Sequence, residues 1–209
     1  MNFIFLGPPG AGKGTLATKV AKEYKIPHIS TGEIFRAAIK NKTKVGIKVK
    51  AVIDAGELVS DELTIQLVKD RLAKPDAQDG FILDGFPRTI AQAEALSNIT
   101  KINAAINFDI ANEAVVERLS GRRVCKECGT NFHVQFNKPK KEGVCDTCGA
   151  ELYIRDDDQI EAIKNRLIVY RESTAPLIDF YKNKKNLVDI DARPAPIEIL
   201  REFMRKFPI

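Results

Sequence analysis

Short apolar segments alternate along the chain with longer stretches in which apolar residues recur at helical spacing. The short segments predict buried strands at 2–6, 80–83, 104–108 and 187–190, with one more near His28 and Ile29. The longer stretches predict helices at 13–24, 61–73, 112–120 and 159–182, with Asp61 and Asn112 as plausible N-caps. This alternation is typical of an α/β fold, here a parallel five-stranded sheet with helices on both faces. Such sheets bind ligands at the carboxyl ends of their strands.

Two segments do not follow the alternation. Residues 30–59 look helical throughout, and residues 122–159 hold all four cysteines together with a basic loop, Lys138–Lys141. We expect both to be inserts on a core domain made of residues 1–29, 60–121 and 160–209.

The first predicted strand leads directly into a glycine-rich segment, Gly7–Thr15, and a predicted helix follows. Glycines let successive backbone N–H groups point into one concavity that holds phosphate oxygens, and the helix N-terminus adds a favourable dipole. Lys13 supplies a positive charge for the β and γ phosphates. The segment therefore predicts a phosphate-binding loop (P-loop) for a nucleoside triphosphate. Gly14 stands where a Ser or Thr would ligate magnesium, so we expect the phosphates, and a carboxylate acting through water, to hold Mg²⁺.

A second segment, residues 80–89, is a predicted strand that ends in an acid and an arginine. Asp84, at the strand end beside a phosphate loop, can orient hydrated Mg²⁺. Arg88, four residues later, can hold a phosphate with two parallel hydrogen bonds. Taken alone, the two residues could be a helix cap and a surface arginine; beside the loop they predict a phosphoryl-transfer site.

The four cysteines form two Cys-x2-Cys pairs, and each pair is followed by a glycine. They are Cys125, Cys128, Cys145 and Cys148. Four thiolates at this spacing suit tetrahedral Zn²⁺, and because sulfur fills every position the metal is expected to be structural. Disulfides are the alternative, which an intracellular location disfavours. Four cysteines alone would also suit iron.

Composition limits the function classes. The chain has 209 residues, of which 44% are hydrophobic, and this is enough to form a full globular core. Its net charge is +5. Its start lacks the basic region of a signal peptide, and no apolar run approaches the ~18 residues of a membrane span. We therefore expect a soluble, cytoplasmic protein that binds no membrane. A pocket for two phosphorylated nucleotides explains the positive charge better than a nucleic-acid surface, because the informative arginines stand singly within motifs.

Together these motifs resemble the adenylate kinases, specifically the bacterial long form with a zinc-binding lid. The matching stretches, in family order, are GPPGAGKGT (7–15), STGEIFR (30–36), LVSDEL (58–63), DGFPRT (84–89), RLSGRR (118–123), the four-cysteine segment, RDDD (155–158) and NRL (165–167). The resemblance implies reversible phosphoryl transfer from MgATP to AMP, giving two ADP, by a monomer. It also implies that residues 30–59 bind the nucleoside monophosphate (NMP) and that residues 122–159 are the zinc-binding, β-rich lid.

The resemblance also assigns roles to residues of this sequence. Catalytic roles would fall to Lys13, Asp84, Arg88, Arg122, Arg155 and Arg166. ATP would be bound by Gly10, Ala11, Gly12, Lys13, Gly14, Thr15, Arg118, Arg122, Asn131 and Phe132, the last of which replaces the usual tyrosine. AMP would be bound by Thr31, Arg36, Glu57, Leu58, Val59, Gly85, Phe86, Pro87, Arg88, Gln92, Arg155 and Arg166. Of the two histidines, His28 is assigned to strand packing and His133 to hydrogen bonding in the lid.

Two alternatives stay open at this point. A kinase for another nucleoside monophosphate (UMP, CMP or GMP) would share the fold, although Gln92 and Thr31 favour AMP. A zinc-ribbon nucleic-acid binder that uses ATP as a switch would need exposed aromatics among basic residues. Phe132, Phe136 and Lys138–Lys141 form the only such cluster, so we expect no nucleic-acid partner.

Overall fold

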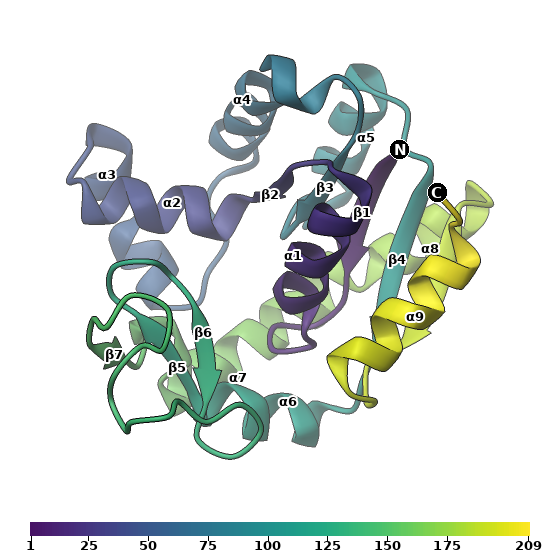
Figure 1. Cartoon of the computed structure of the whole chain (residues 1–209). Helices are drawn as coiled ribbons and strands as arrows, with labels where there is room; N and C mark the ends of the chain where they lie inside the picture. The colour runs from purple at the N-terminus through teal and green to yellow at the C-terminus, as the bar shows by residue number, and fades with distance from the viewer.

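The central sheet of the computed structural model, which describes residues 1–209, consists of five parallel strands. Their spatial order is β2-β3-β1-β4-β8, so the N-terminal strand lies in the middle (Figure 1). The strands are β1 (Asn2–Leu6), β2 (His28–Ser30), β3 (Phe81–Asp84), β4 (Ala104–Asp109) and β8 (Leu187–Asp191). The predicted five-stranded parallel sheet is confirmed.

Helices cover both faces of this sheet, and the side chains of β1 alternate between the two faces. Phe3 and Phe5 pack with α1 (Lys13–Tyr24) and α9 (Pro196–Lys206). Ile4 and Leu6 pack with α4 (Asp61–Leu72), α5 (Ile90–Ile99) and α8 (Pro176–Asn183). Because both faces are buried, the inner strands are continuous apolar runs in the sequence rather than alternating ones. The resulting core fixes the strand ends from which the site loops emerge.

Some predicted elements differ in detail from the structure. The predicted helix at 159–182 is divided into α7 (Ile160–Val169), a π-helical turn η3 (Tyr170–Thr174) and α8. Residues 61 and 112 are the first residues of α4 and of α6 (Asn112–Ser120), so the predicted N-caps are wrong by one position. The carboxylate of Asp61 instead accepts hydrogen bonds from Thr89 and Gln92, a tertiary role that a local pattern does not reveal.

The segment at 30–59 is not helical throughout but contains two helices, α2 (Thr31–Lys40) and α3 (Lys44–Asp54). The chain turns between them, where Lys42 has a φ of +50°. The two helices cross closely because Gly46 has no side chain: a Cβ there would lie 2.1 Å from the carbonyl oxygen of Ala38.

The cysteine-containing segment forms a three-stranded antiparallel sheet of order β6-β5-β7. Its strands are β5 (Arg122–Cys125), β6 (Asn131–His133) and β7 (Leu152–Tyr153), and a 3-10 turn, η2 (Asp156–Asp158), leads back to α7. Outside this segment, the chain has another 3-10 turn, η1 (Pro75–Ala77), which precedes β3. The small sheet lies beside α2 and α3 (Figure 1), and Lys40 Nζ donates to the carbonyl oxygen of Lys126 at 2.9 Å. The division of the chain into three domains stays a prediction.

None of the helices combines the length and the apolar composition that a membrane span requires.

Candidate functional site

The loops that follow the parallel strands converge on a cavity of about 1040 Å³. A smaller recess of about 70 Å³ shares Arg36, Gly85, Arg88 and Arg166 with it. Every predicted nucleotide-binding or catalytic residue lines one of the two spaces, except Phe86. The Phe86 side chain is fully buried in the core, so only its backbone could contact a ligand. The structure thus brings the predicted residues together, and their individual roles stay predictions.

The glycine-rich segment connects β1 to α1 as a tight loop. Gly10 and Gly12 have φ angles of +79° and +93°, which residues with a side chain rarely adopt. A Cβ at Gly10 would also lie 2.8 Å from the side chain of Leu119. Gly12 is the N-cap of α1, so the loop ends at a helix N-terminus, whose unpaired N–H groups and dipole favour an anion.

Lys13 is the first residue of α1, and its side chain folds back over the loop. Its Nζ donates to the carbonyl oxygens of Gly7 at 2.8 Å and Pro8 at 2.7 Å. Burial lowers the pKa of Lys13 from 10.5 to about 8, while Asp84 opposes this effect and Arg88 adds to it. An anion beside Lys13 would therefore stabilise a charge that the protein alone compensates poorly.

Asp84 ends β3 beside this loop. A Cβ at Gly14 would lie 3.2 Å from Asp84 Oδ2, so the absent side chain at position 14 allows the carboxylate to lie close to the loop. His28, on β2, brings its Nε2 to 3.4 Å from the same oxygen. Burial alone would raise the pKa of Asp84, but His28 and Lys13 hold it below 3.8, so the carboxyl is ionised at neutral pH. His28 thus contacts a candidate catalytic group, beyond the strand packing expected for it.

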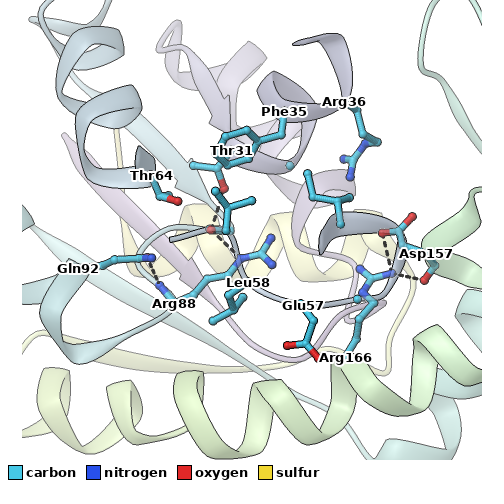
Figure 2. Close-up of a pocket in the computed structure, with 15 residues that line it drawn as sticks. Thr31, Phe35, Arg36, Glu57, Leu58, Thr64, Arg88, Gln92, Asp157 and Arg166 are labelled. Atoms are coloured by element: carbon cyan, nitrogen blue, oxygen red, sulfur yellow. Dashed lines mark hydrogen bonds and ion pairs between the residues drawn. The ribbon is translucent and has the colours of Figure 1, made fainter. Parts of the chain in front are cut away.

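The recess lies between α2, the segment before α4, and the end of β3 (Figure 2). The Gly85 carbonyl oxygen accepts hydrogen bonds from Thr31 Oγ1 and from Arg88 Nε, both at 2.8 Å. These bonds direct the Arg88 guanidinium into the middle of the recess, near Leu58 (Figure 2). Burial lowers the pKa of Arg88 from 12.5 to about 10, and Arg166 adds to the effect.

Gln92 is buried at the end of the recess and is fixed at both polar atoms. Its Oε1 accepts from the Arg88 backbone N–H at 2.7 Å, and its Nε2 donates to Asp61 Oδ1 at 2.7 Å. A carboxamide has two acceptor lone pairs and two donor hydrogens. One of each is therefore still available to a ligand while the protein holds the group in a defined orientation.

An arginine–aspartate cluster, made of Arg122, Arg166, Asp157 and Asp158, lies beside the two spaces, and all of its members except Asp158 line one of them. The Asp158 carboxylate is fully buried and accepts from Arg122 Nε at 2.7 Å and from Arg166 Nη1 at 3.1 Å. Asp157 Oδ2 lies 3.0 Å from Arg166 Nη1, and Figure 2 shows the two side chains pointing toward each other. The sequence alone predicted no role for Asp157 and Asp158. The run of three acids after Arg155 was the available signal.

Cationic side chains outnumber carboxylates among the residues that line the two spaces. The lining cations include Lys13, Arg36, Arg88, Arg122, Arg155 and Arg166, and the lining carboxylates are Glu33, Glu57, Asp84, Glu117 and Asp157. Burial lowers the pKa of Arg155 to about 9, with Arg36 and Arg122 adding to the effect. The Nε of Arg155 is buried without a hydrogen-bond partner. These features suit a ligand that carries several negative charges.

The opposite end of the cavity, near the loop after β8, is more apolar. Arg118 Nη2 donates to the Ala192 carbonyl oxygen at 2.9 Å and so joins α6 to that loop. Phe136 and Ile197 also line the cavity, and 62% and 48% of their surface is exposed. The Phe132 ring instead packs with Cys125, Cys145 and Leu152. Sequence analysis named Phe136 only as a possible base-stacking residue and gave it no place in this site.

The four cysteine thiols lie together at one end of the small sheet. Their sulfur atoms are all within 4.8 Å of one another, and the Cys125–Cys148 and Cys128–Cys145 pairs are separated by 3.4 and 3.6 Å. All four are free thiols, so the disulfide alternative is not supported. A tetrahedral ion with bonds of ~2.3 Å to sulfur needs sulfur separations of ~3.8 Å. The cluster therefore fits one four-coordinate metal ion.

Comparison with known proteins agrees with these features. The adenylate kinase family model matches residues 5–186. The chain is 65% identical over 208 residues to the adenylate kinase of Treponema denticola, with 100% of both chains covered. It is 52% identical to the adenylate kinase of Carboxydothermus hydrogenoformans over 205 residues, 95% of each chain. It is also 52% identical to that of Clostridium tetani over 204 residues, 95% of this chain and 94% of the relative.

Proposed function

This chain belongs to the adenylate kinase family, and on that premise we propose that its site transfers the γ-phosphoryl group of MgATP reversibly to AMP, giving two ADP. The observation that carries the proposal is the excess of buried cations between the glycine-rich loop and the recess. Phosphoryl transfer needs in-line positioning and positive charge around the moving group more than it needs covalent help from the protein. The cavity and the recess meet at these cations, so one space suits the phosphoryl donor and the other suits the phosphoryl acceptor.

On the donor side, the backbone of Gly10–Thr15 and the Lys13 ammonium hold the ATP phosphates. Arg118, Asn131 and the backbone of Phe132 contact the part of ATP that lies beyond the phosphates. When the phosphates are present, Lys13 exchanges its bonds to the Gly7 and Pro8 carbonyl oxygens for bonds to phosphate oxygens.

On the acceptor side, Arg88 and Arg36 hold the AMP phosphate. Gln92 binds the adenine edge through its remaining donor and acceptor, a pattern that matches the amino group and ring nitrogen of adenine. The other AMP residues are Thr31, the backbone of Glu57–Val59, and Gly85–Pro87. The match to adenylate kinases supports AMP over other monophosphates as the acceptor.

In the transfer step, an oxygen of the AMP phosphate forms a bond to the γ phosphorus of ATP. The bond from that phosphorus to the β–γ bridging oxygen breaks on the opposite side, which leaves ADP in both sites. Lys13, Arg122, Arg155 and Arg166 stabilise the negative charge on the oxygens of the moving group. Mg²⁺ bound with ATP would neutralise further charge on the phosphates, and Asp84 is the residue that would hold it through water.

The two inserts exclude water from this step, because water would otherwise accept the phosphoryl group. Residues 30–59 form the NMP-binding domain, residues 122–159 the lid, and residues 1–29, 60–121 and 160–209 the core. Contact between the inserts, such as that of Lys40 with Lys126, closes the cavity above both nucleotides. We further propose that the enzyme acts as a monomer in the cytoplasm.

The metal of the lid is zinc in this proposal, held by the four cysteine thiolates. With four sulfur ligands the ion has no open position for water, so it stabilises the lid rather than taking part in transfer. The apolar cluster of the small sheet is limited to four buried side chains, two of them cysteines, which is little to hold the segment together.

The test is phosphoryl transfer from MgATP to AMP, GMP, CMP and UMP, with ADP formation followed over time and Lys13→Met as the blank. Selective turnover with AMP is the expected result. Preference for another monophosphate would overturn the roles of Gln92 and Thr31, and hydrolysis without acceptor preference would reject the kinase itself. Gln92→Leu should raise the KM for AMP and leave that for ATP unchanged, whereas Gln66→Leu, an exposed position on α4, should change neither.

A further inference from the structure

His133 lies where the lid meets the core, and the proposed reaction does not use it. It is the last residue of β6, and only 8% of its surface is exposed. Its imidazole occupies the space left by Gly121, the residue between α6 and β5: a Cβ there would lie 2.2 Å from His133 Nε2. The ring is therefore packed against the point at which the chain enters the lid.

The hydrogen bonds of this ring define the tautomer of the neutral imidazole. His133 Nδ1 accepts from the backbone N–H groups of Gln135 at 3.0 Å and Phe136 at 3.2 Å. A ring nitrogen that accepts hydrogen bonds carries no proton, so the hydrogen of the neutral ring is on Nε2. Nε2 lies 3.4 Å from the Glu117 carbonyl oxygen, in the last turn of α6. One side chain thus connects α6 to the turn at residues 133–137.

The same turn carries Phe136 into the cavity. The Phe136 ring stacks on the His133 ring, with centroids 4.4 Å apart and planes inclined by 24°. The turn is closed by the backbone N–H of His133, which donates to the Asn137 carbonyl oxygen at 2.8 Å. Phe136 is nevertheless 62% exposed and lines the cavity whose lining also includes Arg118. Nothing but His133 stacks on this aromatic ring from the protein side.

We propose that His133 is a positioning residue for the donor nucleotide. Its Nδ1 fixes the backbone of the turn, and its ring supports Phe136, so that Phe136 presents an ordered apolar surface to the donor base. The inference rests on the proposed function for the identity of that nucleotide. Because the acceptor recess is lined by other residues, the effect should be confined to ATP.

Two conservative variants separate the contributions of the ring nitrogens. In His133→Asn, the amide oxygen lies at the place of Nδ1 and can still accept from the turn. In His133→Gln, the amide reaches the place of Nε2 and leaves the two backbone N–H groups without their acceptor. We expect His133→Gln to raise the KM and the dissociation constant for ATP by ~3–10-fold, because the turn that carries Phe136 loses the acceptor of two backbone N–H groups. His133→Asn keeps the acceptor of the turn but loses the ring that stacks on Phe136, so it should raise both constants by less than His133→Gln does, by ~2-fold. The KM for AMP should be unchanged in both variants.

The control is Phe136→Ala, which should raise the KM for ATP similarly. The double variant with His133→Gln should raise the KM for ATP by less than the two single effects combined, because both changes act through the Phe136 ring. The inference is overturned if His133→Gln leaves ATP binding unchanged, or if the two His133 variants are impaired equally. It is also overturned if the KM for AMP rises as much as that for ATP.

Two further measurements keep the test decisive. If His133→Gln does not fold, the comparison of His133→Asn with Phe136→Ala decides: a measurable but smaller loss of ATP affinity in His133→Asn supports the inference, and no loss, or a loss as large as that of Phe136→Ala, contradicts it. Failure of the proposed function is recognised separately, because the unmodified protein would then form no ADP from ATP and AMP.

Discussion

Replacing Arg88 by methionine is expected to stabilise the nucleotide-free protein while removing most of its activity. Burial and Arg166 lower the pKa of Arg88 from 12.5 to about 10. A cation whose pKa is lower in the folded state destabilises that state at every pH below ~10, and the penalty disappears between ~10 and 12.5. At 1.36 kcal/mol per pH unit, the charged form costs at most ~3 kcal/mol.

Two corrections reduce this figure. The guanidinium borders the open cavity, so solvent screens part of the repulsion and ~2 kcal/mol is a more realistic penalty. Arg88→Met also removes the Nε bond to the Gly85 carbonyl oxygen, which costs ~1 kcal/mol. The net stabilisation is then ~1 kcal/mol, or a rise in Tm of ~2–4 °C for a chain of this size.

The activity should change in the opposite direction. In the proposed reaction Arg88 holds the acceptor phosphate with two charge-assisted hydrogen bonds, each worth ~1.5–3 kcal/mol. Their loss corresponds to a fall of ~10²–10⁴-fold in kcat/KM for AMP. Thermal unfolding without nucleotide and initial rates of ADP formation measure the two quantities independently.

Arg71→Met is the matched control. Arg71 lies outside the site and makes a bidentate pair with Asp76 at 2.9 and 2.7 Å. Its loss should lower the Tm slightly, or not at all, and leave kcat/KM unchanged. If the Tm of Arg88→Met fell along with its activity, Arg88 would be a structural residue and the charge argument would be wrong.

Two other predictions follow from the site and the lid. Because the pKa of Lys13 is lowered to about 8, ~90% of its side chains are neutral at pH 9, and binding of MgATP should take up ~1 proton. Calorimetry in buffers of different ionisation enthalpy measures this uptake, and equal uptake by Lys13→Met would refute the assignment. Cys125→Ser, or removal of the metal by a chelator, should lower the Tm by ~5 °C or more and leave the preference for AMP intact. Loss of turnover at an unchanged Tm would instead indicate a catalytic metal.

The parts of the site that were predictable from sequence are those whose chemistry is local. The glycine-rich loop encodes its own curvature, since Gly10 and Gly12 adopt the positive φ angles that other residues avoid. The two cysteine pairs likewise bring their own ligands within a turn of each other. The strands were found because both faces of the sheet are buried and each strand is an apolar run.

The parts that were missed depend on contacts between distant segments. Asp61 looked like a helix cap, but its carboxylate is used by Thr89 and Gln92, 28 and 31 residues away. His28 looked like strand packing, yet parallel pairing of β2 with β3 places it beside Asp84. Such pairings follow from the order of strands in the sheet, which hydrophobic periodicity does not specify.

The same distinction explains why the charge imbalance is visible only in the folded chain. Lys13, Arg88 and Arg155 come from three separate segments of the sequence. None of these segments has an excess of positive charge, and the cations outnumber the carboxylates only where the folded loops converge. Burial lowers the pKa of all three, so the empty site is less stable than a neutral one would be. A polyanionic ligand removes that penalty and should therefore stabilise the fold in addition to occupying the site. The residues that make the nucleotide-free protein less stable are thus the ones proposed to hold the phosphates of the two nucleotides and the phosphoryl group that moves between them.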